Sequence, residues 1–197
     1  LPSGRLILRK PSFAEGSLQS PKKKCLPNPV DGFGALRVAE KLLPSDEREL
    51  HLRKADLSDM EQYFFWTNDI AVRENSFEQE PIPWESHISW FTKKIKAVDT
   101  KMWVMQTAQG LPLGQVRFDK DGAVINISYS LDPIARGRGL GIKLLELGIH
   151  KVSESISNAV IKGQVKKDNS ASRRIFIKLG FNETTENDVS TFTKKIS

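Results

Sequence analysis

A glycine-rich turn between a strand-like segment and a helix-like segment constrains this chain more than any other feature. Residues 124–131 read V-I-N-I-S-Y-S-L and alternate apolar with polar side chains, which predicts a strand. The turn D-P-I-A-R-G-R-G-L-G follows, and apolar residues then recur at helical spacing to about residue 157. The first N–H groups of a helix lack intrahelical partners and lie at the positive end of its dipole, and glycines let a bulky anion approach. The turn is therefore predicted to bind a phosphate.

The glycine spacing argues against two common phosphate-binding motifs. A P-loop requires Gly-Lys followed by Ser or Thr, whereas I-K-L follows Gly141. A dinucleotide-binding turn has an acidic residue about twenty positions further on, where this chain reads V-I-K at 160–162. The pattern present is R-x-x-G-x-G at Arg136, Gly139 and Gly141. A glycine-rich turn without a ligand is the alternative interpretation.

Two motifs together resemble the GNAT superfamily of acetyl-CoA-dependent N-acetyltransferases. The first is the R-x-x-G-x-G turn, which is similar to the family's pyrophosphate loop. The second, N-x-x-S-x-x-x-F-x-K-L-G-F, spans residues 169–181 and follows about thirty positions later. The resemblance covers roughly residues 50–196. It implies an α/β (α+β) fold with a mixed, mostly antiparallel sheet flanked by helices.

The hydrophobic pattern along the chain agrees with such a fold. Turn signals at 109–110 and 121–122 predict an antiparallel meander of three strands. The helix that begins at Trp84 is expected to bury Ile88, Phe91, Ile95 and Val98. Strands are expected at 50–54, 101–108, 113–119, 124–131, 159–165 and 191–193, and helices at 59–67, 84–98, after Gly141 and after Asn169.

The first part of the chain differs in composition from the rest. We expect residues 1–48 to form an N-terminal appendage or linker and residues 49–197 to form the GNAT-like domain. Residues 30–39, V-D-G-F-G-A-L-R-V-A, resemble the C-terminal end of the UDP-sugar hydrolases of pseudaminic acid biosynthesis. The alternative is a tail that packs on the domain without chemistry. The sequence leaves open whether the chain is a fragment of a longer fusion.

Composition narrows the class of protein further. The single cysteine, Cys25, excludes an internal disulfide and suits a reducing compartment, so we expect a cytoplasmic protein. No apolar run approaches the length of a membrane span. The net charge is +6, but Lys and Arg are interspersed with acidic residues, so we expect no binding to nucleic acid. No metal site is expected, and the oligomeric state is left open.

The resemblance implies a role for each part of an acetyl-CoA site. Backbone groups at Ser130 and Leu131 would pair with the pantetheine arm, and N–H groups of residues 136–142 would hold the pyrophosphate. Asn169 would lie near the arm, and Lys178 near the ribose phosphate. The full implied set is Leu131, Arg136, Gly137, Arg138, Gly139, Leu140, Gly141, Ile142, Asn169, Phe176 and Lys178.

One position departs from the family pattern. Many members carry a tyrosine seven residues after the asparagine, which protonates the departing thiolate, whereas this chain has Phe176. A phenyl ring has no proton to give, so water or another donor is expected to serve, or the domain does not turn over. Tyr129 alternates with apolar residues and is assigned to the core. Candidates that orient a water or act as a base are Ser128, Ser130, Glu74, Glu78 and His87.

A segment upstream bears on the acceptor amine. W-T-N-D at 66–69 and the polar loop after it are similar to nucleotide-sugar N-acetyltransferases of pseudaminic acid biosynthesis, and also to ribosomal-protein alanine acetyltransferases. The former implies the 4-amino group of a UDP-linked deoxy sugar as the favoured acceptor. A protein N-terminus, another small amine, or a non-catalytic binding module are the alternatives. The implied acceptor-binding residues are Trp66, Asn68, Arg73, Trp84 and His87, with Trp66 and Trp90 equally suited to the core.

Overall fold

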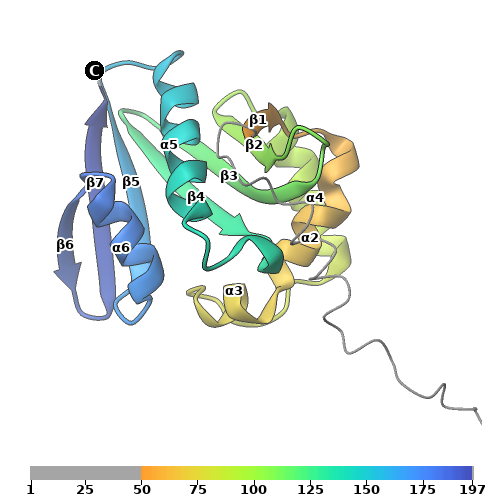
Figure 1. The fold of residues 1–197 in the computed structure, drawn as a ribbon, viewed down its shortest axis with the longest axis horizontal. Helices are drawn as coiled ribbons and strands as arrows, with labels where there is room; N and C mark the ends of the chain where they lie inside the picture. Colours follow the sequence, from red (N-terminus) through yellow and green to blue (C-terminus); the bar gives the residue numbers. More distant parts are fainter. Residues whose placement is uncertain (1–49, 197) are drawn as a thin grey trace, which may run out of the picture.

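The computed structural model describes residues 50–196, which form a seven-stranded sheet in the order β1-β2-β3-β4-β5-β7-β6, with helices on both faces (Figure 1). Every neighbouring pair of strands is antiparallel except β4 and β5, which are parallel. The expected mixed, mostly antiparallel sheet is confirmed. The appendage expected at 1–48 lies outside the described residues.

The elements follow one another as a strand, three α-helices, a three-stranded meander, a helix and a strand, and a last helix with two strands. The strands are β1 (His51–Lys54), β2 (Thr100–Gln106), β3 (Pro112–Asp121), β4 (Val124–Leu131), β5 (Ala159–Lys166), β6 (Asn182–Glu186) and β7 (Val189–Ile196). The α-helices are α2 (Met60–Asn68), α3 (Ile70–Glu74), α4 (Trp84–Lys96), α5 (Leu140–Ser153) and α6 (Ser170–Lys178), and the 3₁₀ helices are η2 (Leu57–Asp59) and η3 (Pro133–Ala135).

Two elements lack a sequence signal. Helix α3 has only five residues, too few to show a helical period, and Asp69 begins it by accepting a hydrogen bond from the N–H of Val72. Strand β6 reads N-E-T-T-E and lies at the edge of the sheet, where most of its side chains are exposed. Because β6 buries no apolar face, it shows no alternation of apolar and polar residues.

The predicted buried face of α4 is wrong in part. Ile88 is 37% exposed and Val98, which lies beyond the end of the helix, is 90% exposed. The core positions are taken by Phe91 and by His87, which is only 1% exposed. His87 Nε2 lies 2.8 Å from the carbonyl oxygen of Met60, which makes this nitrogen the donor. A satisfied polar side chain can occupy an apolar position, and a pattern of hydrophobic residues does not register it.

Strands β4 and β5 pair over three positions only, from Val124 opposite Val160 to Asn126 opposite Lys162. Beyond that point the strands diverge toward the end of the sheet where α3 and α6 lie (Figure 1). Helix α5 supplies the crossover that a parallel pair requires. The edge of β4 that faces β5 therefore has no strand neighbour over residues 127–131.

Two hydrophobic clusters hold helices on the opposite faces of the sheet. Helix α5 packs its fully buried Leu144, Leu145 and Val152 on one face. Its approach is close, because a Cβ placed at Gly148 would lie 3.0 Å from a methyl carbon of Val116 on β3. On the other face, α2 and α4 bury an aromatic group that includes Tyr63, Trp66 and Phe91.

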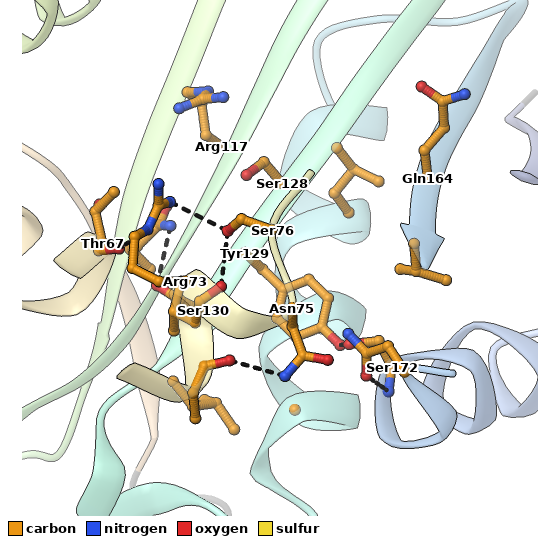
Figure 2. A pocket seen from close by; sticks show the side chains of 18 of the residues that line it. Thr67, Arg73, Asn75, Ser76, Arg117, Ser128, Tyr129, Ser130, Gln164 and Ser172 are labelled. Atoms are coloured by element: carbon orange, nitrogen blue, oxygen red, sulfur yellow. Dashed lines mark hydrogen bonds between the residues drawn. The ribbon is translucent and has the colours of Figure 1, made fainter. Parts of the chain in front are cut away.

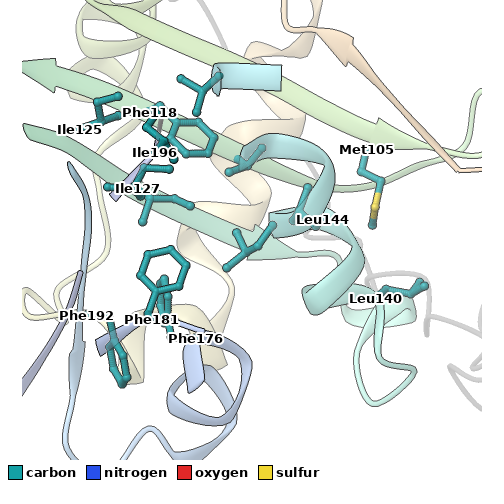
Figure 3. Packing of buried hydrophobic residues seen from close by; sticks show 14 of the residues in the cluster. Met105, Phe118, Ile125, Ile127, Leu140, Leu144, Phe176, Phe181, Phe192 and Ile196 are labelled. Atoms are coloured by element: carbon teal, nitrogen blue, oxygen red, sulfur yellow. The ribbon is translucent and has the colours of Figure 1, made fainter. Parts of the chain in front are cut away.

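Phe176 fills the space where β4 and β5 begin to separate (Figure 3). Its ring stacks on Phe192 at 4.9 Å and meets Phe181 edge-on at 5.1 Å. A Cβ placed at Gly163 would lie 2.5 Å from Phe176 Cζ and 3.2 Å from Ile127 Cγ2. Gly163 and Ile127 are the first residues past the last paired position, so the ring occupies the base of the divergence.

Gly163→Ala is expected to lower the free energy of unfolding by about 1–3 kcal/mol, because the added methyl overpacks a filled core. Urea denaturation of the two proteins measures this difference. In a Phe176→Leu background, which withdraws the ring tip, the same glycine substitution is expected to cost less than about 1 kcal/mol. Equal costs in the two backgrounds would contradict the packing described.

Candidate active site

A cavity of about 1310 Å³ opens where β4 and β5 separate. One part, the α5–α6 half, lies between the turn before α5 and the first turns of α6. The other, the α3–α4 half, lies between the loop after α3, helix α4 and the polar face of β3 and β4. Figure 2 shows Arg117, Ser128, Ser130 and Arg73 in this second half. The α5–α6 half is lined by Leu131, Arg136, Gly137, Gly139, Leu140, Gly141, Ile142, Asn169, Phe176 and Lys178 among others.

The implied coenzyme residues are thus brought together, with the exception of Arg138, which does not line the cavity. Gly137 and Gly139 have φ angles of +73° and +78°, and a Cβ at either would meet no atom within 4 Å. These glycines are required for the left-handed backbone rather than for space. Helix α5 begins at Leu140 without a side-chain cap, so its first N–H groups suit an anion.

Gly141 serves a different purpose. A Cβ at this position would lie 2.6 Å from Ile175 Cδ1 on α6. The glycine therefore allows α5 and α6 to approach each other beside the cavity. Asn169 caps α6 by accepting a hydrogen bond from the N–H of Ser172 at 3.1 Å.

The side chain of Arg136 is held by neighbouring protein groups. Its Nη2 donates to Asp69 Oδ1 at 2.7 Å, and Nε and Nη2 both lie within 3.2 Å of the carbonyl oxygen of Leu131. The guanidinium therefore joins the cap of α3 to the end of β4. Its Nε and Nη2 are engaged in these contacts, and the residue also lines the cavity.

The W-T-N-D motif acts as a structural junction. Trp66 is 1% exposed and its Nε1 donates to Asp132 Oδ2 at 2.8 Å, next to η3. Asn68 holds Ile82 in the loop after α3 through two hydrogen bonds of 2.8 and 3.0 Å. Asp69 caps α3 and binds Arg136. Neither Trp66 nor Asn68 lines the cavity, so the structure does not bring them to an acceptor.

The other three implied acceptor residues also have structural partners. Arg73 lines the cavity, but its guanidinium donates to the carbonyl oxygens of Thr67 and Glu78 and so shapes the loop. Trp84 does not line the cavity; it stacks with His87 at 5.8 Å. His87 lines the cavity but is only 1% exposed. Burial lowers its pKa and its Nε2 donates to Met60, so the imidazole is neutral.

The candidates for proton transfer divide into two groups. Glu74 does not line the cavity, and its backbone carbonyl accepts a hydrogen bond from Lys166 Nζ at 2.8 Å. Glu78, Ser128 and Ser130 do line it. Ser130 is 7% exposed, and its Oγ accepts a hydrogen bond from the side-chain amide of Gln115 at 3.1 Å.

Tyr129 lies on the apolar face of β4, as its alternation predicts, but it also lines the cavity. Its hydroxyl donates to Ser172 Oγ at 2.9 Å, and its ring centroid lies 6.2 Å from that of Phe176. Burial raises the pKa of the Tyr129 hydroxyl, so it stays protonated at neutral pH.

The sequence analysis did not single out Gln115 and Arg117, two polar residues of β3 that line the cavity. A signal was available: in G-Q-V-R-F-D the polar residues alternate with Val116 and Phe118. Once β3 pairs with β4, this polar row lies beside Ser130 and Ser128.

The family model described as Acetyltransferase (GNAT) domain matches residues 49–182, and the chain belongs to this family. A spermidine N-acetyltransferase from Vibrio cholerae, solved with CoA and spermine, is 18% identical over 75% of this chain and 96% of its own, with a TM-score of 0.68. RimL, a ribosomal L7/L12 alpha-N-protein acetyltransferase solved with coenzyme A, is 18% identical over 78% and 97%, with a TM-score of 0.65. No curated protein matches the chain.

A third similar structure is yncA from Salmonella typhimurium with acetyl-CoA, 19% identical over 76% of this chain and 95% of its own, with a TM-score of 0.62. These likenesses support the fold. Membership of the family makes the chain an N-acetyltransferase of the GNAT type, with acetyl-CoA as the acyl donor. None of the helices within residues 50–196 has the length and apolar character needed to cross a membrane. The same residues contain no cluster of three or more His, Cys, Asp or Glu side chains suited to a metal.

Asp69→Asn is expected to weaken acetyl-CoA binding about three- to fivefold. Asparagine still caps α3, but the charge that holds Arg136 and the turn behind it is lost. Calorimetric titration with acetyl-CoA measures the effect, and Asp56→Asn, which changes the cap of η2, serves as the matched control. Equal or tighter binding by Asp69→Asn would show that Arg136, once released, contacts the diphosphate itself.

Gly139→Ala is expected to weaken acetyl-CoA binding about tenfold, because an alanine strains the left-handed backbone of the phosphate turn. Gly110→Ala is the control: its φ is +85° and a Cβ there also meets no atom within 4 Å, but it lies in the β2–β3 turn. Both variants are expected to lose thermal stability, and only Gly139→Ala to lose affinity. Similar affinities for the two variants would contradict the assignment of the turn.

Proposed function

We propose that this N-acetyltransferase transfers the acetyl group to the primary amine of a nucleotide-linked amino sugar, with the 4-amino group of a UDP-linked deoxy sugar as the favoured acceptor. The observation that carries the proposal is the wall of the α3–α4 half. There, Gln115 and Arg117 on β3 lie opposite Ser130 and Ser128 on β4. Hydroxyl, amide and guanidinium groups suit the hydroxyls and phosphates of such an acceptor.

The sequence adds two features in favour of this acceptor. The W-T-N-D element and its polar loop are similar to nucleotide-sugar acetyltransferases, and residues 30–39 resemble the end of a UDP-sugar hydrolase from the same pathway. A hydrolase segment beside a transferase would join adjacent steps in one chain.

In the proposed reaction the neutral amine attacks the thioester carbonyl, a C–N bond forms, and the C–S bond breaks. The amine loses one proton and the CoA sulfur gains one. Ser128 and Ser130 would orient a water that accepts the proton, and Glu78, one of the carboxylates that line the cavity, takes the place of Glu74 as the candidate base. Phe176 cannot supply a proton, so water protonates a thiolate whose pKa is close to the ~8.5 of cysteine.

We assign acetyl-CoA to the α5–α6 half. Backbone N–H groups between Gly137 and Gly141 hold its diphosphate, since those of Arg136 and Ile142 already donate to Pro133 and Gly139. The edge of β4 that lacks a strand neighbour pairs with its pantetheine arm around Ser130 and Leu131, where the carbonyl oxygen of Leu131 is already held by Arg136. Asn169 and Lys178 flank the arm and the ribose phosphate. This arrangement leaves the sulfur where the strands diverge, between the two halves of the cavity.

Two solved neighbours suggest other acceptors. The Vibrio cholerae enzyme is a spermidine N-acetyltransferase and RimL acts on a protein N-terminus, as their names state. A polyamine carries several positive charges, and the acceptor half here presents Arg73, Arg117 and Lys162 against Glu78, Glu80 and Asp119. Asp119 is already paired with Lys94 and Arg117, which leaves less negative charge for a polycation.

The test is a CoA-release assay with the purified chain and a panel of a UDP-linked 4-amino-6-deoxy sugar, spermidine and an alanine-initiated peptide. We expect the sugar nucleotide to give the highest kcat/KM, with the acetylated product identified by mass spectrometry. A preference for spermidine or the peptide would overturn the acceptor while leaving the transferase in place. Measurable acetyl-CoA binding without CoA release from any amine would favour a non-catalytic module.

A further inference from the structure

The polar residues Gln115, Arg117, Ser128 and Ser130 form one wall of the α3–α4 half, called here the acceptor wall. Arg117 lies in the middle of this wall and has no role in the hydrophobic core. In the strand register it lies between Met102 on β2 and Ser128 on β4. Its side chain is 22% exposed and lines the cavity (Figure 2). Ser128 belongs to the part of β4 that borders the divergence, so Arg117 is one strand away from the point assigned to the thioester.

The guanidinium is fixed by two contacts. Its Nε donates to Asp119 Oδ2 at 2.7 Å, and its central carbon lies 5.0 Å from the centre of the Trp90 ring. The second carboxylate oxygen of Asp119 is held by Lys94 at 2.7 Å and Thr100 at 2.8 Å. Within residues 50–196, Nε is the one nitrogen of Arg117 that donates to another residue. The two terminal nitrogens form a preorganised fork of N–H donors.

The charges around this fork favour an anion. Burial acts to raise the pKa of Asp119, but the charge of Arg117 and the hydrogen bonds from Lys94, Thr100 and Arg117 outweigh it and lower this pKa. Asp119 is therefore ionised, and its single charge faces two cations. The group retains a net positive charge. A substrate ammonium cannot form a cation–π contact with Trp90, because Arg117 already covers that ring.

We propose that Arg117, stacked on Trp90 and oriented by Asp119, is an anion subsite that binds a phosphate of the acceptor. This inference rests on the proposed function and specifies what the acceptor must carry. Neighbouring strands are about 4.8 Å apart, so an anion bound by Arg117 lies about one to two strand spacings from the reacting amine. A phosphate across one sugar ring from the amine matches that separation. The carboxylate of an α-amino acid, which is attached to the carbon that bears the amine, does not.

The experiment compares acceptors that carry a diphosphate, a phosphate, a carboxylate or no anion. The full chain is assayed with a UDP-linked 4-amino-6-deoxy sugar, the same sugar as its 1-phosphate, its uncharged methyl glycoside, and an aminohexanoate that carries a carboxylate instead. We expect Arg117→Gln to lower kcat/KM about ten- to a hundredfold for the two phosphorylated acceptors, since a charge-assisted contact is lost, and to leave the glycoside within about twofold. Arg117→Lys keeps the charge without the fork and is expected to recover part of the loss.

Two controls separate a local effect from a folding defect. Lys120→Gln removes an exposed cation from the same strand outside the cavity and is expected to change none of these values. Acetyl-CoA affinity and melting temperature of Arg117→Gln are expected to stay close to those of the parent. With CoA saturating the other half, the phosphorylated sugar is expected to shift the fluorescence of Trp90 in the parent and not in Arg117→Gln.

The outcomes distinguish the subsite from the proposed function. Equal losses for the glycoside and the phosphorylated acceptors, or no loss for any, would overturn the subsite while sugar acetylation stands. A selective loss for aminohexanoate alone would overturn the choice of phosphate. If the parent acetylates no sugar but binds the phosphorylated sugar through Arg117, the proposed function fails and the subsite stands.

Discussion

The separation of β4 from β5 is the constraint on which the rest of the structure depends. Pairing ends at Asn126 and Lys162, and the ring of Phe176 fills the base of the gap against Gly163 and Ile127. A sheet edge buried without partners is costly, so a divergence inside a sheet needs something to satisfy it. In a GNAT acetyltransferase, the extended coenzyme arm contains amide groups that can supply the missing hydrogen-bond partners. The same position explains why an aromatic residue without a hydroxyl is compatible with the fold: its ring is required for packing.

A network of polar contacts joins the acceptor side of the molecule to the coenzyme turn. Trp66 to Asp132 and Asp69 to Arg136 connect the end of α2 and the start of α3 with the residues that lead into α5. The turn is thus supported from behind by side chains, while its own backbone faces the cavity. Residues that the sequence pattern suggests as ligand-binding instead stabilise the geometry of the site through contacts within the protein. We propose that the acceptor is bound instead by the polar face of β3 and β4.

The sequence predicted long, periodic elements well and short or polar ones poorly. Strand β4 was predicted at its observed bounds because its alternation is regular and a glycine-rich turn ends it. Helix α3 and strand β6 are short and bury little, so they carry no periodic signal. His87 lines the cavity, but its burial and its hydrogen bond to Met60 depend on tertiary contacts that the sequence does not show.

The sequence by itself determined the fold and the phosphate-binding turn. Left-handed glycines ahead of an apolar helix and a second motif after a buried strand have few other structural solutions. Only the tertiary structure decided which polar side chains reach the cavity. Arg136 and Arg117 are chemically alike in the sequence, but one is engaged by Asp69 and Leu131 and the other lies over Trp90 on the acceptor wall. The physical reason is that a guanidinium's hydrogen-bond donors are taken up by partners that are distant in the sequence and become neighbours only in the folded chain.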